Sequence, residues 1–319
     1  MQLGFADIEA VAGAELPGST RRHSSWWSNG PTNPYASIWR EAGWKMRMPR
    51  LEQETVVFVR EQGSPRPDPA RSSELTTAQR IQPTAEPMSP ELDRLYALME
   101  ALRSRVGGER LLRDCNVRMG WPARGVYFFF EDSERLPDGR PRIVRVGTHA
   151  IVERSSSTLW GRLAQHKGRF SRESGMAGGN HRGSIFRRHV GDALLASTHE
   201  YDGALPSWGV GASAPSEVTL RERALEAEVS NVIGSMPFLW VAVDDDPSPS
   251  SDRAAIERSC IALLSSQYTT RITPASQEWL GRHAKREQIR ASGLWNVDHV
   301  GAPFEASGID ALERWVGRM

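Results

Sequence analysis

Two side chains in the middle of the sequence have the types and the spacing for phosphate chemistry. Arg162 and His166 lie four residues apart within 157–166, a segment whose pattern predicts a helix. Residues at this spacing share one helix face. A guanidinium binds two phosphate oxygens at once, and an imidazole can hydrogen-bond a phosphate or relay a proton. The pair therefore indicates chemistry at a phosphate, with an ordinary solvated helix face as the alternative.

The chain around this pair is strongly basic. From Arg162 to His189, seven lysines and arginines against one acid, Glu173, give a net charge of +6 over 28 residues. The seven are Arg162, Lys167, Arg169, Arg172, Arg182, Arg187 and Arg188. A glycine-rich loop, 178–184, could bring its backbone close to a phosphate. The alternatives are a DNA-binding surface and a solvated loop, and the DNA contacts expected are Lys167, Arg169, Asn180, His181, Arg182, Arg187 and Arg188.

The elements that must position these residues follow from periodicity. Segments 125–130 and 142–147 are rich in β-branched and aromatic residues and predict two strands, with a turn signal at Asp138-Gly139 between them. Ser89-Pro90 predicts the start of a helix. The other predicted elements are the rest of that helix to 106, a strand over 238–243 and a helix over 253–264. A hairpin mixed with helices predicts an α+β domain.

The order of motifs along these elements resembles the GIY-YIG nuclease family. Gly125-Val126-Tyr127 begins the first strand, and Arg145-Val146-Gly147 ends the second. Arg162 and His166 follow on one helix, and Ile256-Glu257-Arg258 heads a later one. The resemblance covers about residues 120–300. It implies a small mixed sheet flanked by helices with insertions, and the activity of a metal-dependent DNA endonuclease.

The resemblance also implies a role for each motif residue. Tyr127 would orient or deprotonate the attacking water, and it would need a cation nearby because a free tyrosine is mostly protonated at neutral pH. Arg162 and His166 would bind the scissile phosphate. Glu257 would hold Mg²⁺ or Mn²⁺, since Mg²⁺ accepts one protein carboxylate together with waters and phosphate oxygens.

The sequence departs from the family pattern at two places. Arg145 stands where the family has its second tyrosine. It can supply positive charge beside Tyr127, but it cannot act as a general base. Asn296 is the candidate for the family's late asparagine and for a DNA contact, although it lies far from Glu257 in the sequence. The second hypothesis is therefore a DNA-binding or regulatory module that has lost catalysis.

The chain before this domain divides into two parts. Residues 61–90 contain six prolines among polar residues and predict an extended linker, which places the nuclease-like domain at 91–319. Residues 1–60 predict a small α/β domain, with helices over 5–11 and 36–42 and strands over 44–48 and 54–60. This part resembles a small bacterial domain of unknown function. Its four tryptophans, which could form a core or stack on bases, are Trp26, Trp27, Trp39 and Trp44.

Composition limits the remaining possibilities. The 319 residues carry a net charge of +1, so the basic stretch is balanced by acids elsewhere. Two cysteines are too few for a disulfide framework, which fits a cytoplasmic protein. The sequence has no apolar run long enough for a membrane helix, no signal peptide and no nucleoside-triphosphate loop, so we expect no membrane association and no nucleotide cofactor. Double-stranded DNA is the expected partner. Because each domain has one active site, cutting both strands would need a homodimer or sequential nicking. Restriction or defence is favoured over repair because no helicase or ATPase module accompanies the domain.

Overall fold

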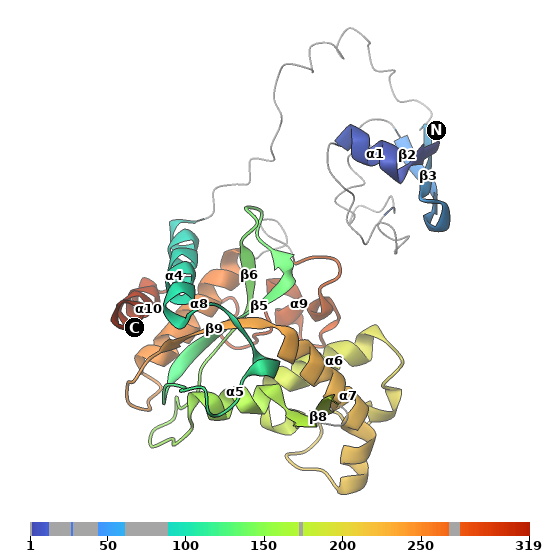
Figure 1. Ribbon diagram of the computed structural model, residues 1–319. Coiled ribbons are helices and arrows are strands. Elements are labelled where there is room, and N and C mark those ends of the chain that lie inside the picture. The colour runs from blue at the N-terminus through green and yellow to red at the C-terminus, as the bar shows by residue number, and fades with distance from the viewer. Residues whose placement is uncertain (1, 13–26, 28–43, 61–88, 172–174, 268–274) are drawn as a thin grey trace. The chain divides into compact units, whose positions relative to one another are not determined.

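The computed structural model describes residues 2–12, 27, 44–60, 89–171, 175–267 and 275–319. The chain forms two compact units, residues 1–82 and 83–319 (Figure 1). Most of the proline-rich segment, 61–88, lies outside the described residues, and so does the helix predicted over 36–42. The linker and its boundaries therefore remain predictions.

The first unit contains a three-stranded antiparallel sheet in the order β1-β3-β2. Its elements are β1 (Gln2–Gly4), α1 (Phe5–Ala12), β2 (Trp44–Arg50), the 3-10 turn Leu51–Gln53 and β3 (Thr55–Arg60). These confirm the predicted helix over 5–11 and the two predicted strands. The small core consists of Phe5, Trp27, Met46, Val56 and Phe58.

The tryptophans of this unit serve packing where the structure describes them. Trp27 is buried and stacks on Phe5 with 5.1 Å between ring centroids. Trp44 is partly buried beside the core, with the Arg60 guanidinium 5.9 Å from its ring centroid. Trp26 and Trp39 lie outside the described residues.

The second unit is built on a four-stranded sheet in the order β4-β9-β5-β6. The strands are β4 (Arg110–Leu111), β5 (Gly125–Arg135), β6 (Pro141–Gly147) and β9 (Pro237–Ala242). They confirm the three predicted strands and the α+β class. Every pair among the described strands is antiparallel, which corrects the expected mixed sheet. The reason is that β9 returns beside β5 in the opposite direction to it, so no parallel crossover forms.

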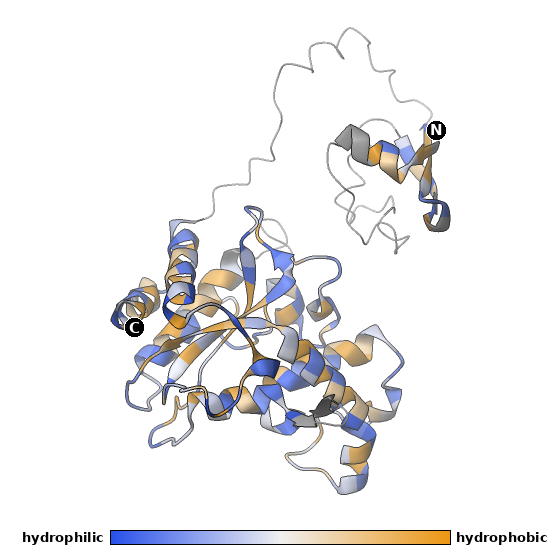
Figure 2. Cartoon of the chain, in the orientation of Figure 1, coloured by the Kyte–Doolittle hydropathy of each residue, from blue (hydrophilic) through white to orange (hydrophobic). Residues whose placement is uncertain are grey.

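Helices cover both faces of this sheet, because alternate residues of β5 face two different cores. Val126, Phe128 and Phe130 face one core, and Tyr127 and Phe129 face the other. The first core is covered by α4 (Pro90–Val106), α8 (Asp252–Gln267) and α10 (Ala306–Arg318). The second is covered by α5 (Leu159–Lys167), α6 (Ile185–Ser197) and α7 (Ser216–Ser235). In Figure 2 the apolar colour is concentrated on the strands between these helices.

Local signals explain where the helices begin and end. The Ser89 hydroxyl accepts a hydrogen bond from the amide of Leu92, and α4 ends at Gly107, whose φ is 77°. The Thr158 hydroxyl accepts from the amide of Gly161 at the start of α5. These helices and α8 confirm the three predicted in this unit.

A long insertion separates α5 from β9, and no helix or strand was assigned to it from the sequence. It contains the hairpin β7 (Arg169–Ser171) and β8 (Gly175–Gly178), the 3-10 turn His181–Gly183, α6, the 3-10 turn Asp202–Ala204 and α7. The remaining short elements are the 3-10 turns Leu112–Asp114 and Leu280–His283 and α9 (Glu287–Ser292).

Candidate active site

Tyr127 and His166 form the centre of the site, as a buried pair from β5 and α5. The Tyr127 hydroxyl lies 2.7 Å from His166 Nε2, and neither side chain is exposed. On its other side, His166 Nδ1 lies 2.7 Å from the Ser184 hydroxyl, which caps α6. A chain of hydrogen-bonding groups therefore runs from the tyrosine to the start of α6.

Two glycines make room for this arrangement. Gly147 pairs directly with Tyr127 across the β5–β6 ladder, and a Cβ at Gly147 would lie only 2.4 Å from the Tyr127 hydroxyl. Gly125 has the same constraint against the backbone, since a Cβ there would lie 2.4 Å from the carbonyl oxygen of Val241. The glycines of both sequence motifs are therefore required by close packing.

Arg145 places a buried cation beside the tyrosine. Arg145 pairs with Phe129, so it lies diagonally from Tyr127 on the same face of the sheet. Its Nη1 donates to the carbonyl of Trp295 at 2.6 Å, and its guanidinium lies 4.5 Å from the ring centroid of Phe186. Burial lowers the pKa of Arg145, and its interactions with Tyr127 and Glu257 oppose that shift. An arginine keeps its proton under such conditions, so positive charge is present here.

The environment of His166 keeps its imidazole neutral. Burial lowers the pKa of His166 well below its usual value, and the charges of Arg162, Arg145 and Arg187 lower it further. A neutral imidazole donates through one nitrogen and accepts through the other. His166 can therefore accept a proton from one neighbour while it donates to the other.

Arg162 is one of the catalytic candidates that are not fully buried. It is half-buried on α5, and its Nη1 donates to Gln165 Oε1 at 3.0 Å. Within the described residues it forms no ion pair with a carboxylate, so its charge is available to an anion. Arg162 also lines a cavity of about 300 Å³ together with Ser184 and Arg188.

Glu257 approaches the end of β6 from α8. Its Oε1 accepts from the backbone amide of Thr148 at 3.2 Å. Burial raises the pKa of Glu257, while Arg145, the Thr148 amide and Arg162 act against the increase. The described residues contain no cluster of three or more metal-ligating side chains. Within the described residues, a metal at Glu257 would therefore have at most one further ligand of this kind, and Mg²⁺ commonly completes its coordination with water and substrate oxygens.

Comparison with known proteins decides the family. Residues 86–319 match the GIY-YIG domain, and residues 1–62 match a domain of unknown function, DUF7662. The chain belongs to the GIY-YIG family. Both resemblances expected from the sequence are confirmed. No curated protein and no solved structure matches the chain.

Membership of the GIY-YIG family makes this a nuclease-type domain. The structure brings five predicted site residues together at the open end of the β5–β6 hairpin, where Tyr127 pairs with Gly147. They are Tyr127, Arg145, Arg162, His166 and Glu257. No helix of the described residues has the length and apolar character needed to cross a membrane.

Asn296 supports the edge of the GIY-YIG sheet. Its Oδ1 accepts from the amide of Val146 at 3.1 Å, and its Nδ2 donates to the carbonyl of the same residue at 2.8 Å. β6 is an edge strand, so the asparagine completes backbone hydrogen bonds that no neighbouring strand provides. Its side chain is thereby turned to β6, beside Arg145 and Gly147, and DNA contact by Asn296 remains a prediction.

Three of the basic residues expected at DNA are buried in ion pairs with α7. Arg182 forms a bidentate pair with Glu222, at 2.6 and 2.9 Å. Arg187 donates to Glu226 and also to the carbonyl of His166, at 2.8 Å. His181 Nδ1 lies 2.9 Å from Glu226, and its ring stacks on Trp208. This network orients α5, α6 and α7 around the site, and its charge is compensated internally.

The other expected contacts lie nearer the surface. Lys167 is half-buried and donates to the carbonyl of Cys115, and Asn180 is exposed and caps the turn at Arg182. Arg169 and Arg188 form no ion pair at hydrogen-bond distance within the described residues. Arg172 lies outside the described residues.

Sequence analysis missed four polar residues that hold the site. Ser184 contacts His166, and Thr148 contacts Glu257. The sequence does not mark these two residues, because serine and threonine are common in loops. Glu222 and Glu226 had a clearer signal. Two glutamates four residues apart on a helix share one face, which fits them to neutralise a basic segment.

Proposed function

We propose that the GIY-YIG domain is a divalent-metal-dependent endonuclease that hydrolyses the backbone of double-stranded DNA. The observation that carries this proposal is the 2.7 Å contact between Tyr127 and the neutral His166, with Arg145 and Arg162 close by and Glu257 at the end of β6. Such a group offers a proton acceptor, cations for a phosphate and one carboxylate.

Each of these residues is assigned one role. Tyr127 takes a proton from the attacking water while its own proton passes to His166 Nε2, which accepts when Nδ1 donates to Ser184. Arg162 binds the scissile phosphate, and Arg145 adds positive charge as negative charge develops in the transition state. Glu257 is the protein ligand for Mg²⁺ or Mn²⁺, which when bound would stabilise charge on the phosphate and leaving oxygens.

The wider setting is also part of the proposal. Both cysteines are buried free thiols, which supports a reducing cytoplasm. Restriction or defence is favoured over repair, because the sequence carries no ATPase motif. Cutting both strands requires a homodimer or two successive nicks.

A second candidate function rests on Arg145. This residue replaces a family tyrosine and donates to the Trp295 carbonyl, so it also has a structural use. A domain that kept the fold and lost hydrolysis would bind DNA or regulate without cutting.

Plasmid cleavage distinguishes the two functions. With Mg²⁺ or Mn²⁺ we expect the wild type to nick supercoiled DNA, and Tyr127→Phe and Glu257→Gln to lose about 100-fold or more of the rate. Tyr201→Phe, at a half-buried tyrosine away from the site, is the matched control. A wild type that binds DNA and never cuts it across pH and metals would favour the binding module. A wild type that does not bind DNA would reject both functions.

A further inference from the structure

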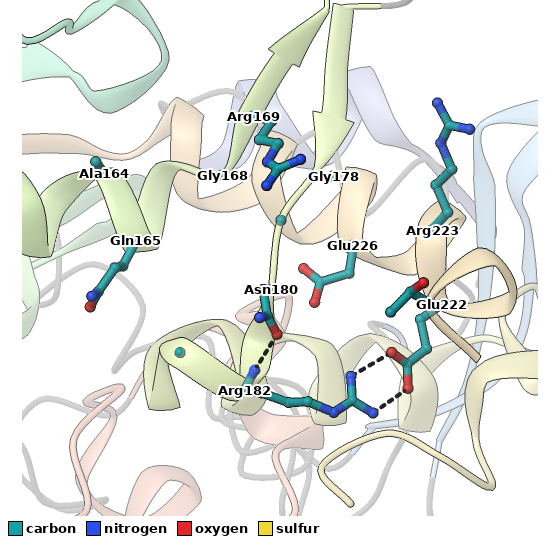
Figure 3. A pocket seen from close by; sticks show the side chains of 13 residues that line it. Ala164, Gln165, Gly168, Arg169, Gly178, Asn180, Arg182, Glu222, Arg223 and Glu226 are labelled. Atoms are coloured by element: carbon teal, nitrogen blue, oxygen red, sulfur yellow. Dashed lines mark hydrogen bonds and ion pairs between the residues drawn. The ribbon is translucent and has the colours of Figure 1, made fainter. Parts of the chain in front are cut away.

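A second, larger cavity lies beside the candidate active site. It has a volume of about 770 Å³ and is open to solvent between α7 and the chain that follows β8 (Figure 3). One wall is a single face of α7, formed by Thr219, Glu222, Arg223 and Glu226. The other wall consists of the end of α5 and the glycine-rich loop 178–183. The loop predicted to approach a phosphate therefore lines this cavity.

Glycines bring the backbone of that loop close to the buried ion pairs. A Cβ at Gly179 would lie 2.3 Å from the Arg187 guanidinium carbon, and one at Gly168 would lie 2.5 Å from the Ser230 hydroxyl. A side chain at Gly179 would push the loop away from Arg187 of α6, and one at Gly168 would push the end of α5 away from Ser230 of α7. The part of the cavity wall that contains Gly168 and Gly179 is therefore closely packed against polar side chains.

The two carboxylates that line the cavity already have partners. Burial tends to raise the pKa of Glu222, but hydrogen bonds from Arg182 and Ser207 hold it below its usual value. The pKa of Glu226 is likewise lowered against burial, by His181 and Arg187. Both are therefore ionised, and each charge is balanced by a buried cation.

Two arginines in the cavity lack such a partner. Arg169 on β7 and Arg223 on α7 are exposed, and within the described residues neither forms a hydrogen bond or ion pair through its side chain. In Figure 3 no interaction is drawn to either guanidinium, whereas Arg182 is joined to Glu222. In the described part of the chain, the cavity therefore presents two positive charges with which no carboxylate pairs.

This cavity lies next to Arg162, since it shares Arg182 and Gly183 with the cavity that Arg162 lines. Gln165 lines the cavity, and its Oε1 accepts from Arg162 Nη1 at 3.0 Å. A DNA strand whose scissile phosphate lay at Arg162 would therefore continue past Gln165 toward Arg169 and Arg223.

We propose that this cavity is a second phosphate site, in which Arg169 and Arg223 bind backbone phosphates of the DNA strand that flanks the scissile phosphate. The inference rests on the proposed function for the identity of the ligand. Contacts to the phosphate backbone fix register and orientation without reading sequence. The insertion thus has a specific use: β7 and α7 hold the strand while α5 presents it for cleavage.

The test is a salt titration of DNA binding without metal. We expect the double variant Arg169→Gln/Arg223→Gln to bind a labelled duplex of about 20 base pairs more weakly than wild type, with a slope of log Kd against log salt that is smaller by about two. Fluorescence anisotropy in EDTA measures both values. Circular dichroism and thermal unfolding establish that the variant is folded.

Arg221→Gln is the matched control. Arg221 is on the same helix and is exposed, but it pairs with Glu217 at 2.8 Å and does not line the cavity. It should keep the wild-type slope. A folded double variant with the wild-type slope, or an equal loss in Arg221→Gln, would overturn the phosphate site alone. Wild type that binds with the expected slopes but never cleaves would support this site and reject the nuclease activity. Wild type without duplex affinity would overturn both.

Discussion

Gly147 sets the position of the active-site hydroxyl. An alanine there would place its methyl group 2.4 Å from the Tyr127 hydroxyl, well inside van der Waals contact, so the ring would have to move away from His166. We expect Gly147→Ala to lower plasmid cleavage about 100-fold and to destabilise the fold by about 1–3 kcal/mol, as overpacking does. Cleavage rates and urea denaturation measure the two effects.

Gly203→Ala is the control for this substitution. A Cβ at Gly203 would meet nothing within 4 Å, and its φ is not positive, so both activity and stability should be retained. Full activity in Gly147→Ala would show that hydrolysis does not need the hydroxyl at its observed position.

The environment of Glu131 should make the stability of the folded protein depend on pH. Its Oε1 accepts from the indole nitrogens of Trp279 and Trp295, at 3.2 and 2.8 Å. Burial nevertheless raises the pKa of Glu131 from 4.5 to about 7, so the folded state binds the proton more tightly than the unfolded chain. The stability gained from protonation is therefore complete below pH 4.5 and is lost as pH rises through 7.

The substitution Glu131→Gln tests this linkage, because glutamine keeps an acceptor oxygen for both indoles and carries no charge. We expect it to remove the decline in unfolding free energy across this pH range and to stabilise the protein by about 1–3 kcal/mol above pH 7. Urea denaturation at a series of pH values measures the difference. The exposed Glu153→Gln is the control, and parallel curves for wild type and Glu131→Gln would contradict the assignment.

At the level of elements, the Asn296 side chain bonds the end of the edge strand β6, as the Tyr96 hydroxyl does at Ile143. Both polar atoms of the Asn296 amide bond to the backbone of Val146, which lies between Arg145 and Gly147. Asn296→Ala leaves a buried amide and carbonyl without partners, so we expect a loss of about 2 kcal/mol in unfolding free energy and a lower cleavage rate. Asn231→Ala is the control, since the exposed Asn231 donates to the half-buried Glu228 on α7. Equal stability of the two variants would contradict this role.

Local patterns predicted the elements that carry the motifs, because their signals are local. Alternation on β5 and β6, the Ser89 cap and the spacing of Arg162 and His166 each lie within a few residues. Local patterns could not predict which basic residues are buried in ion pairs and which have no carboxylate partner. Nothing in the local sequence distinguishes Arg182 and Arg187 from Arg188. The carboxylates that pair with the first two come from α7, 40 and 39 residues away in the sequence. Only tertiary packing shows which arginines remain for a ligand.

At the level of the whole molecule, net charge says little about the ligand. The total is +1, yet Arg162, Arg169, Arg188 and Arg223 pair with no carboxylate at hydrogen-bond distance in the described part of the chain. Acids and bases pair with each other in many places along the chain, and these four arginines line the two cavities beside α5 and α7. The distribution of charge, rather than its sum, supports a DNA ligand.

The division into two units predicts separable functions. Residues 83–319 contain the four-stranded sheet, both of its cores and every candidate catalytic residue. We expect this fragment to unfold cooperatively and to cleave DNA. The first unit has its own core and tryptophans with basic residues near them, and we propose that it helps to target the nuclease. Its removal should therefore change DNA affinity or the choice of cleavage sites, as measured by binding assays and by sequencing of the cut ends.

A point variant separates the effect of this unit from that of chain length. Phe5 is fully buried and stacks on Trp27 in the small core that the described residues of this unit form. Phe5→Ala should therefore cost about 3–5 kcal/mol and unfold the first unit in the full-length chain. If folding of that unit is what targets the nuclease, the variant reproduces the affinity and cleavage pattern of the fragment 83–319. Wild-type affinity and site choice in both proteins would exclude a targeting role for the first unit and leave the activity of the GIY-YIG domain untouched.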